Sequence, residues 1–172
     1  MPEEEFLYWN KEECEKRLSL EPNDLKAIFR LALIEMQERN FQKALNLLLT
    51  VDQKDPQFMR VHVCMKIGET LIKQEGKNDQ ALEWFIKAEE AIAPNKDYLI
   101  TLFKAKSLDR LKRYDEAIEA FKQCIILYRT EDFVEDQFLG NLHFRLGWTQ
   151  IRSRLNSSQG IENLKIAQQL LP

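Results

Sequence analysis

The sequence has little glycine and little proline, with five of each in 172 residues. Because these residues form most tight turns, their scarcity argues against many short strands and favours long helices. The chain is 44% hydrophobic and 31% charged, which is too apolar for a disordered tail. We therefore expect a single soluble all-α domain over residues 1–172, a length that suits one domain of about 100–200 residues.

Three further absences exclude classes of function. The 25 basic residues are outnumbered by 28 acidic ones, so there is no basic excess for binding nucleic acid. The longest uncharged apolar run, Cys124–Tyr128, is far shorter than the roughly 20 residues that span a bilayer, so we expect no membrane insertion. The charged first twenty residues contain no signal-peptide core. The cysteines, Cys14, Cys64 and Cys124, form no close pair, which favours a reducing compartment and predicts a cytoplasmic protein.

Candidate catalytic residues are few, and their spacing does not bring them together. His62 and Cys64 lie two positions apart on a predicted helix, so their side chains diverge. No feature of the sequence brings His143 towards a cysteine. The sequence lacks the HExxH, CxxC and calcium-loop patterns and both glycine-rich phosphate-binding motifs. We expect no enzyme activity, no metal and no cofactor.

The prolines are regularly spaced. Pro22 and Pro56 lie 34 residues apart, Pro56 and Pro94 lie 38 apart, and Pro94 and Pro172 lie 78 apart, which is twice 39. Such a period indicates helical repeats, each formed by two amphipathic helices that a short polar turn makes antiparallel. The predicted turns are Glu38–Asn40, Gln74–Asn78, Lys112–Arg113 and Asn156–Ser158.

The second helix of each predicted pair carries the same apolar stripe. A small residue is followed by an aliphatic one, and apolar residues at i+4 and i+7 complete one helix face. The small residue allows a neighbouring helix to approach closely. We expect Gly68 and Gly147, which lie in the first helix of their pairs, to allow a close approach as well. The four stripes are Ala44-Leu45-Leu48-Val51, Ala81-Leu82-Phe85-Ala88, Ala117-Ile118-Phe121-Cys124 and Gly160-Ile161-Leu164-Ala167.

These features resemble the tetratricopeptide repeat (TPR) family, whose unit of 34 residues is a pair of helices, A and B. Phe41–Ala44 and Tyr114–Ile118 are similar to the aromatic-x-x-Ala signature of helix B, and Glu21–Asp24 to the turn between repeats. Four residues depart from the pattern: Glu35 and Gln150, where a bulky apolar residue is usual, Lys104, where an aliphatic residue is commoner, and Arg129, where Pro would stand. The resemblance implies a right-handed α-solenoid with an N-terminal helix at 5–21 and repeats at 25–58, 59–95, 97–130 and 133–172.

The resemblance also implies a protein-binding function. In this family the A helices line a concave groove that takes a partner peptide or helix, and here we expect the groove to be apolar. We predict a scaffold or adaptor in a multiprotein assembly. The alternative is a regulatory or targeting module of an enzyme or chaperone-linked protein with its other domain outside this chain. The groove positions carried over are Lys26, Phe29, Leu33, Met36, Met65, Glu69, Ile72, Leu99, Leu102, Lys106, Asp109, Phe144, Trp148, Ile151 and Arg152.

The two ends of the chain differ in this interpretation. Residues 5–21 have the pattern of a helix B that covers the first repeat. Gln168–Pro172 follow the last stripe without a polar covering helix, whereas solenoids need polar terminal faces. We therefore expect the chain to be part of a longer repeat protein, or to associate with another copy through its C-terminal end.

The small stripe positions provide a test. Replacing Ala44, Ala81 or Ala117 by Leu should lower the free energy of unfolding by about 1–3 kcal/mol, because the added methylenes overpack the helix contact. Urea unfolding followed by circular dichroism measures this. Unchanged unfolding midpoints would show that these alanines lie on an open face.

Overall fold

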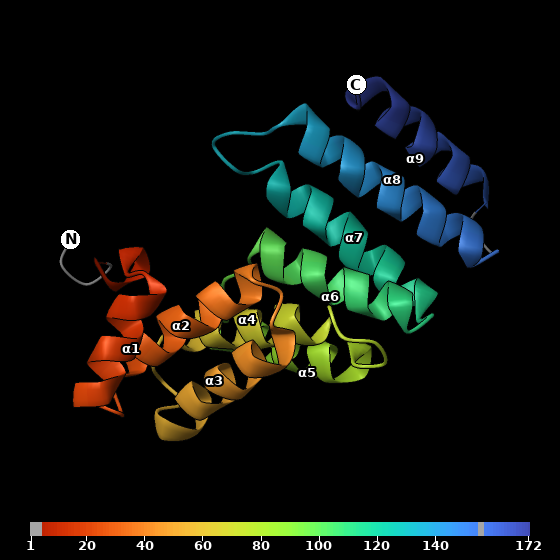
Figure 1. Cartoon of the computed structure of the whole chain (residues 1–172). Helices are drawn as coiled ribbons and strands as arrows, with labels where there is room; N and C mark the ends of the chain where they lie inside the picture. The colour runs from red at the N-terminus through yellow and green to blue at the C-terminus, as the bar shows by residue number, and fades with distance from the viewer. Residues whose placement is uncertain (1–4, 155–156) are drawn as a thin grey trace. The chain divides into compact units, whose positions relative to one another are not determined.

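The structure is a computed structural model that describes residues 5–154 and 157–172 (Figure 1). This described part contains nine α-helices and one short 3-10 helix, and no strand. The predicted fold class, antiparallel helix pairs preceded by an N-terminal helix, is confirmed. Packing divides the chain into two compact units, Met1–Ala91 and Ile92–Pro172, and each is described by itself.

The first unit contains the N-terminal helices and two helix pairs. The 3-10 helix η1 and helix α1 pack on α2, which pairs with α3. Helix α4 packs on α3, and α5 follows α4. The bounds are η1 Glu5–Tyr8, α1 Lys11–Leu20, α2 Leu25–Gln37, α3 Phe41–Lys54, α4 Arg60–Leu71 and α5 Asn78–Ile92.

The second unit contains two further helix pairs. Helix α6 pairs with α7, α7 packs on α8, and α8 lies along α9 (Figure 1). The fourth predicted turn, Asn156–Ser158, begins at a residue outside the described ranges, and Ser157 already opens the last helix. The bounds are α6 Tyr98–Arg110, α7 Tyr114–Tyr128, α8 Asp136–Arg152 and α9 Ser157–Leu170.

Side-chain caps and left-handed residues fix several helix ends. Asn10 and Glu13 form a capping box at α1, and Asp97 accepts hydrogen bonds from two backbone N–H groups at the start of α6. Three A helices end in the same way, with a left-handed residue two positions after the helix: Arg39, Lys112 and Arg154 have φ angles of 63°, 62° and 61°. This conformation reverses the chain within a few residues and makes A and B antiparallel.

The predicted stripes of the B helices form the core. Every residue of the first three stripes is buried, with the leading alanines fully inaccessible. For the fourth stripe the prediction is confirmed only in part. Gly160 and Ala167 are buried, but Ile161 is 52% exposed. Since α9 packs mainly on α8, one side of this helix has no neighbour within the second unit.

The predicted close approaches at glycine are confirmed. A Cβ atom built on Gly68 would lie 2.5 Å from the Phe85 ring. One built on Gly147 would lie 2.8 Å from the carbonyl oxygen of Gly160, and the reverse distance is the same. Helices α8 and α9 therefore cross backbone to backbone at this point, and neither glycine has room for a side chain.

Two of the four departures from the repeat pattern, Glu35 and Gln150, are buried polar residues with partners. The Glu35 carboxylate is fully buried and accepts hydrogen bonds from Lys43 and Asn40, both at 2.7 Å, and Lys11 Nζ lies 3.0 Å away. These contacts join α1, α2 and α3. Burial alone would raise the pKa of Glu35, but the hydrogen bonds from Lys43, Asn40 and Lys11 outweigh it and lower the pKa to about 2.

Gln150 is the corresponding polar residue of the fourth helix pair. Its side-chain oxygen accepts a hydrogen bond from Asn163 at 3.0 Å, and the Asn163 oxygen lies 2.7 Å from Nδ1 of the buried His143. This network joins α8 to α9. His143 therefore serves in packing, while His62 lies on the surface.

Glu35→Gln should lower the free energy of unfolding by about 2 kcal/mol at pH 7, because hydrogen bonds to a buried charged group are lost. The folded-state pKa of Glu35 is about 2, below the ordinary value of 4.5. Its stabilising effect is therefore complete above about pH 4.5 and is lost as the pH falls towards 2. Urea unfolding between pH 7 and pH 2.5 should show that the free energy of unfolding falls less steeply with decreasing pH for the variant than for wild type. Glu83→Gln, on the exposed face of α5, is the control; equal acid losses for wild type and Glu35→Gln would contradict the assignment.

Candidate functional site

Three of the seven predicted groove positions of the first unit lie in its core. Phe29 is 2% exposed and packs edge-on against Phe6 and Phe58, with ring centroids 6.4 and 6.3 Å apart. Met65 and Ile72 are also buried. We therefore treat these three side chains as packing residues. Lys26 is exposed, and Leu33, Met36 and Glu69 are half-buried, with Glu69 paired to Lys66.

The second unit brings four predicted positions together. Leu102 is buried, whereas Leu99 is exposed, and Lys106 and Ile151 are half-buried. The other four line one open cavity of about 330 Å³ between α6 and α8, together with a residue that we did not predict, Arg145. We call this site the α6–α8 surface; its residues are Asp109, Phe144, Arg145, Trp148 and Arg152.

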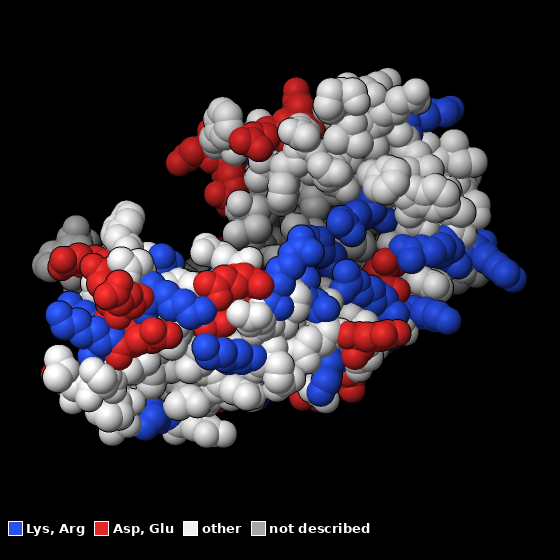
Figure 2. Space-filling view, viewed as in Figure 1, with Lys and Arg blue, Asp and Glu red and all other residues white. Residues whose placement is uncertain are grey.

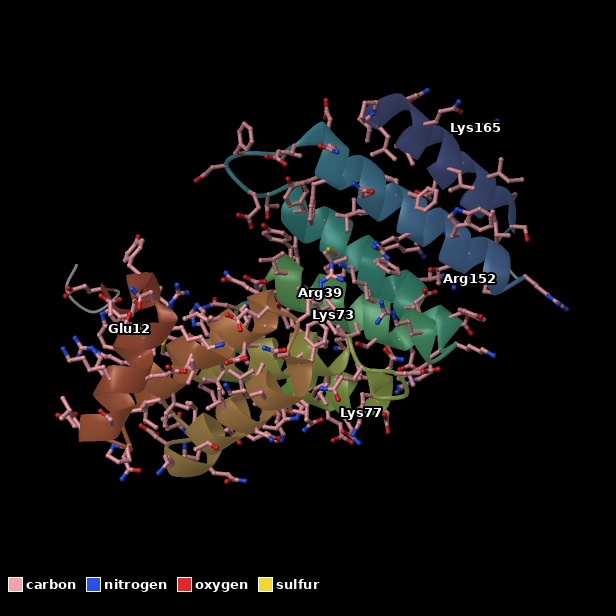
Figure 3. All side chains as sticks on the ribbon, in the orientation of Figure 1. Glu12, Arg39, Lys73, Lys77, Arg152 and Lys165 are labelled. Carbon is pink, nitrogen blue, oxygen red and sulfur yellow. The ribbon has the colours of Figure 1, made fainter. Side chains whose placement is uncertain are left out.

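The helix pattern of α8 explains why these side chains share one face. Leu146, Gly147 and Gln150 of this helix are buried, while Phe144, Trp148 and Arg152 follow at intervals of four on the exposed side. Figure 3 shows Arg152 at the C-terminal end of α8. The neighbouring A helix, α6, supplies Asp109.

A charged bridge joins the two A helices at this surface. The Arg152 guanidinium donates to both Asp109 carboxylate oxygens at 2.6 and 2.7 Å, and the Thr149 hydroxyl donates to one of them at 3.0 Å. Asp109 is mostly buried, whereas Arg152 is half-exposed. This geometry fixes the spacing of α6 and α8, and with it the width of the cavity.

The apolar part of the surface is an exposed aromatic pair. Phe144 and Trp148 are 45% and 44% exposed, and their rings meet edge to face with centroids 6.2 Å apart. Two large exposed aromatic side chains side by side are unusual on a surface without a partner, whereas aromatic residues and Arg are enriched in interface cores.

The electrostatic potential expected at the α6–α8 surface is positive. Arg145 has no ion pair within the described ranges. Desolvation and the nearby Arg110 charge lower the pKa of the Arg145 guanidinium, although it stays charged at neutral pH. Figure 2 shows Lys and Arg side chains gathered over this part of the second unit, while Asp and Glu gather at the loop between α7 and α8.

Features of other classes of function are missing from the described ranges. These ranges contain no group of three or more His, Cys, Asp or Glu side chains placed to hold a metal. None of their helices has the length and apolarity needed to cross a membrane. The three cysteines are free and buried, and burial raises the pKa of the Cys124 thiol to about 12, so it is not an activated nucleophile.

Residues 102–130, which cover α7 and most of α6, match the family described as Tetratricopeptide repeat. This segment of the chain is therefore a tetratricopeptide repeat (TPR). Folds of this family are protein-interaction modules, which agrees with an exposed aromatic and basic surface on the A helices of the second unit. A search of curated proteins gives no match for the TPR chain.

Solved structures similar to the TPR chain support the fold over nearly its whole length. MamA residues 41–end from Desulfovibrio magneticus RS-1 is 16% identical, with a TM-score of 0.79 over 93% of this chain and 82% of that one. MamA of MSR-1 is 21% identical, with a TM-score of 0.75 over 93% and 84% of the two chains. MamA of AMB-1 is 22% identical, with a TM-score of 0.75 over 91% and 85%.

Arg145 is the residue of the α6–α8 surface that the sequence-based prediction of the groove left out. It directly follows Phe144, and the groove positions carried over from the family pass over it. Its spacing provided one signal, because Arg145 and Trp148 are three residues apart and therefore neighbours on a helix.

The bridge between α6 and α8 gives a prediction for the TPR chain. Asp109→Asn should lower the free energy of unfolding by about 1 kcal/mol, because a two-pronged, partly buried charge pair is lost. A double-mutant cycle with Arg152→Met measures the coupling of the two residues. The control is Glu119→Gln, whose pair with Lys122 lies on the open surface and should contribute little. A coupling energy of zero for Asp109 and Arg152 would rule out the bridge as a stabilising contact.

Proposed function

We propose that this TPR chain is a non-catalytic scaffold or adaptor that holds a protein partner on the α6–α8 surface. The observation that carries the proposal is the exposed Phe144–Trp148 pair beside Arg145, which lacks an ion pair in the described part of the chain. Exposed aromatic rings gain free energy when a partner removes them from water. An adjacent guanidinium adds orientation, because it donates several hydrogen bonds in a fixed plane.

The shape of the surface suits a peptide or one face of an amphipathic helix. The cavity of about 330 Å³ takes one or two apolar side chains and is too small for a folded domain. Phe144 and Trp148 are one helical turn apart, so they form a short ridge along α8. A partner segment with apolar side chains on one face and acidic ones beside them complements this ridge.

Four finer features belong to the same proposal. The acidic balance of the whole chain argues against nucleic acid as the partner. The free thiols suit a reducing compartment, and we infer a cytoplasmic location. The surface could equally serve a regulatory or targeting module of a larger protein. Association through the C-terminal end remains a separate proposal, supported by the exposed Ile161 of α9.

The test is affinity capture from an extract of the source cells. We expect wild type to retain a partner that the double variant Phe144→Glu/Trp148→Glu loses, because two exposed aromatic side chains that the partner would cover become charged. Ile126→Glu is the matched control, since Ile126 is an exposed apolar residue on the B helix α7.

Two further measurements show whether a lost partner reflects the α6–α8 surface itself or a change in the fold. Thermal melting by circular dichroism should be the same for all three proteins, since every substituted side chain is exposed. Hydrogen exchange on the captured complex should protect α8 around Trp148. Retention of the same partners by the double variant would remove the α6–α8 surface from the proposal.

A further inference from the structure

The loop between α7 and α8 exposes an apolar residue among acidic ones. Phe133 is 75% exposed, and Val134 beside it is also exposed. Four carboxylates surround this pair within six residues, and none of them has an ion pair within the described ranges. Figure 2 shows Asp and Glu side chains gathered around this loop. The four carboxylates are those of Glu131, Asp132, Glu135 and Asp136.

The base of this loop is held in place by an aromatic cluster. The rings of Tyr98, Tyr128 and Phe138 pack together with centroids 4.4–5.7 Å apart. The Glu135 backbone N–H donates a hydrogen bond to the Tyr128 hydroxyl oxygen at 2.9 Å. A segment already held in its exposed conformation loses little conformational entropy when it binds. Phe133 is therefore presented to solvent by a pre-organised support.

The α6–α8 surface has the complementary chemistry. It offers the aromatic pair Phe144 and Trp148, a cationic Arg145 without an ion pair in the described part, and a cavity of about 330 Å³. An apolar cavity of about 150 Å³ already holds a benzene molecule, so a phenylalanine ring fits here. The acidic flanks of the loop match the guanidinium groups beside the cavity.

The loop cannot reach the α6–α8 surface of its own chain. It ends where α8 begins, at Asp136, and Trp148 lies twelve residues further along the same helix, about 18 Å away at 1.5 Å per residue. Both ends of the loop are fixed by α7 and α8. If this loop occupies such a cavity, the cavity therefore belongs to another molecule.

We propose that the acidic loop, residues 131–136, docks Phe133 into the α6–α8 surface of a second copy of this chain. The inference rests on the proposed function, because it uses the same surface and names its occupant. Each copy has one loop and one surface, at different places on the second unit. The contact is therefore head-to-tail, and it builds a row or a closed ring of copies rather than a two-fold dimer.

Sedimentation velocity of the full chain tests this proposal. Wild type should sediment faster as its concentration rises, and salt should reverse the effect because exposed charges contribute. Phe133→Ser and Trp148→Glu should each weaken self-association by about tenfold or more. An equimolar mixture of the two variants should form a one-to-one complex, because one keeps the surface and the other keeps the loop.

Two controls distinguish this contact from association through a different face of the molecule. Ile161→Ser alters an exposed apolar residue of α9 and should associate like wild type; loss of association only in this variant would place the contact at the C-terminal end and overturn the proposal. A wild type that stays monomeric at all concentrations would overturn it as well. If partner capture still depended on Phe144 and Trp148 in that case, the proposed function would stand while this inference failed.

Discussion

The close contact between the two helices of each pair is the constraint on which the structure depends. Ala44, Ala81 and Ala117 are fully buried at the same position of their B helices, and Gly147 and Gly160 face each other across the last pair. A close crossing of this kind leaves no space for water, so the larger apolar residues of each stripe become buried on either side of it. The A helices then take their positions from the B helices, and the α6–α8 surface follows from that spacing.

Buried polar groups add specificity where the apolar pattern is interrupted. Glu35 joins three helices of the first unit, and Gln150 with Asn163 and His143 joins α8 to α9. A buried charge is costly unless every partner is in place, so such a group tolerates a single arrangement of its helices. The positions that depart most from the repeat pattern are therefore the ones that fix the neighbours of each helix.

Sequence reasoning predicted the B helices better than the A helices, for a physical reason. A B helix buries one stripe, so its apolar spacing of i, i+4 and i+7 identifies the buried face directly. The apolar residues of an A helix are instead divided between core and surface. Phe29 and Leu102 are buried, whereas Phe144 and Trp148 at similar predicted groove positions are half-exposed. The spacing places a residue on a face, but which neighbouring helix covers that face depends on the tertiary packing. The same reason accounts for Ile161, whose stripe lacks a second neighbour within its unit.

The buried thiols give the molecule built-in reporters of local opening. Cys14 lies in α1, Cys64 in α4 and Cys124 in α7, so the thiols stand in three different segments of the chain. Burial raises the pKa of all three, which keeps them protonated and unreactive while their helices stay packed. Repeat proteins open segment by segment, because each repeat contacts only its neighbours. The order in which the three cysteines become reactive is therefore a record of which end of the solenoid frays first.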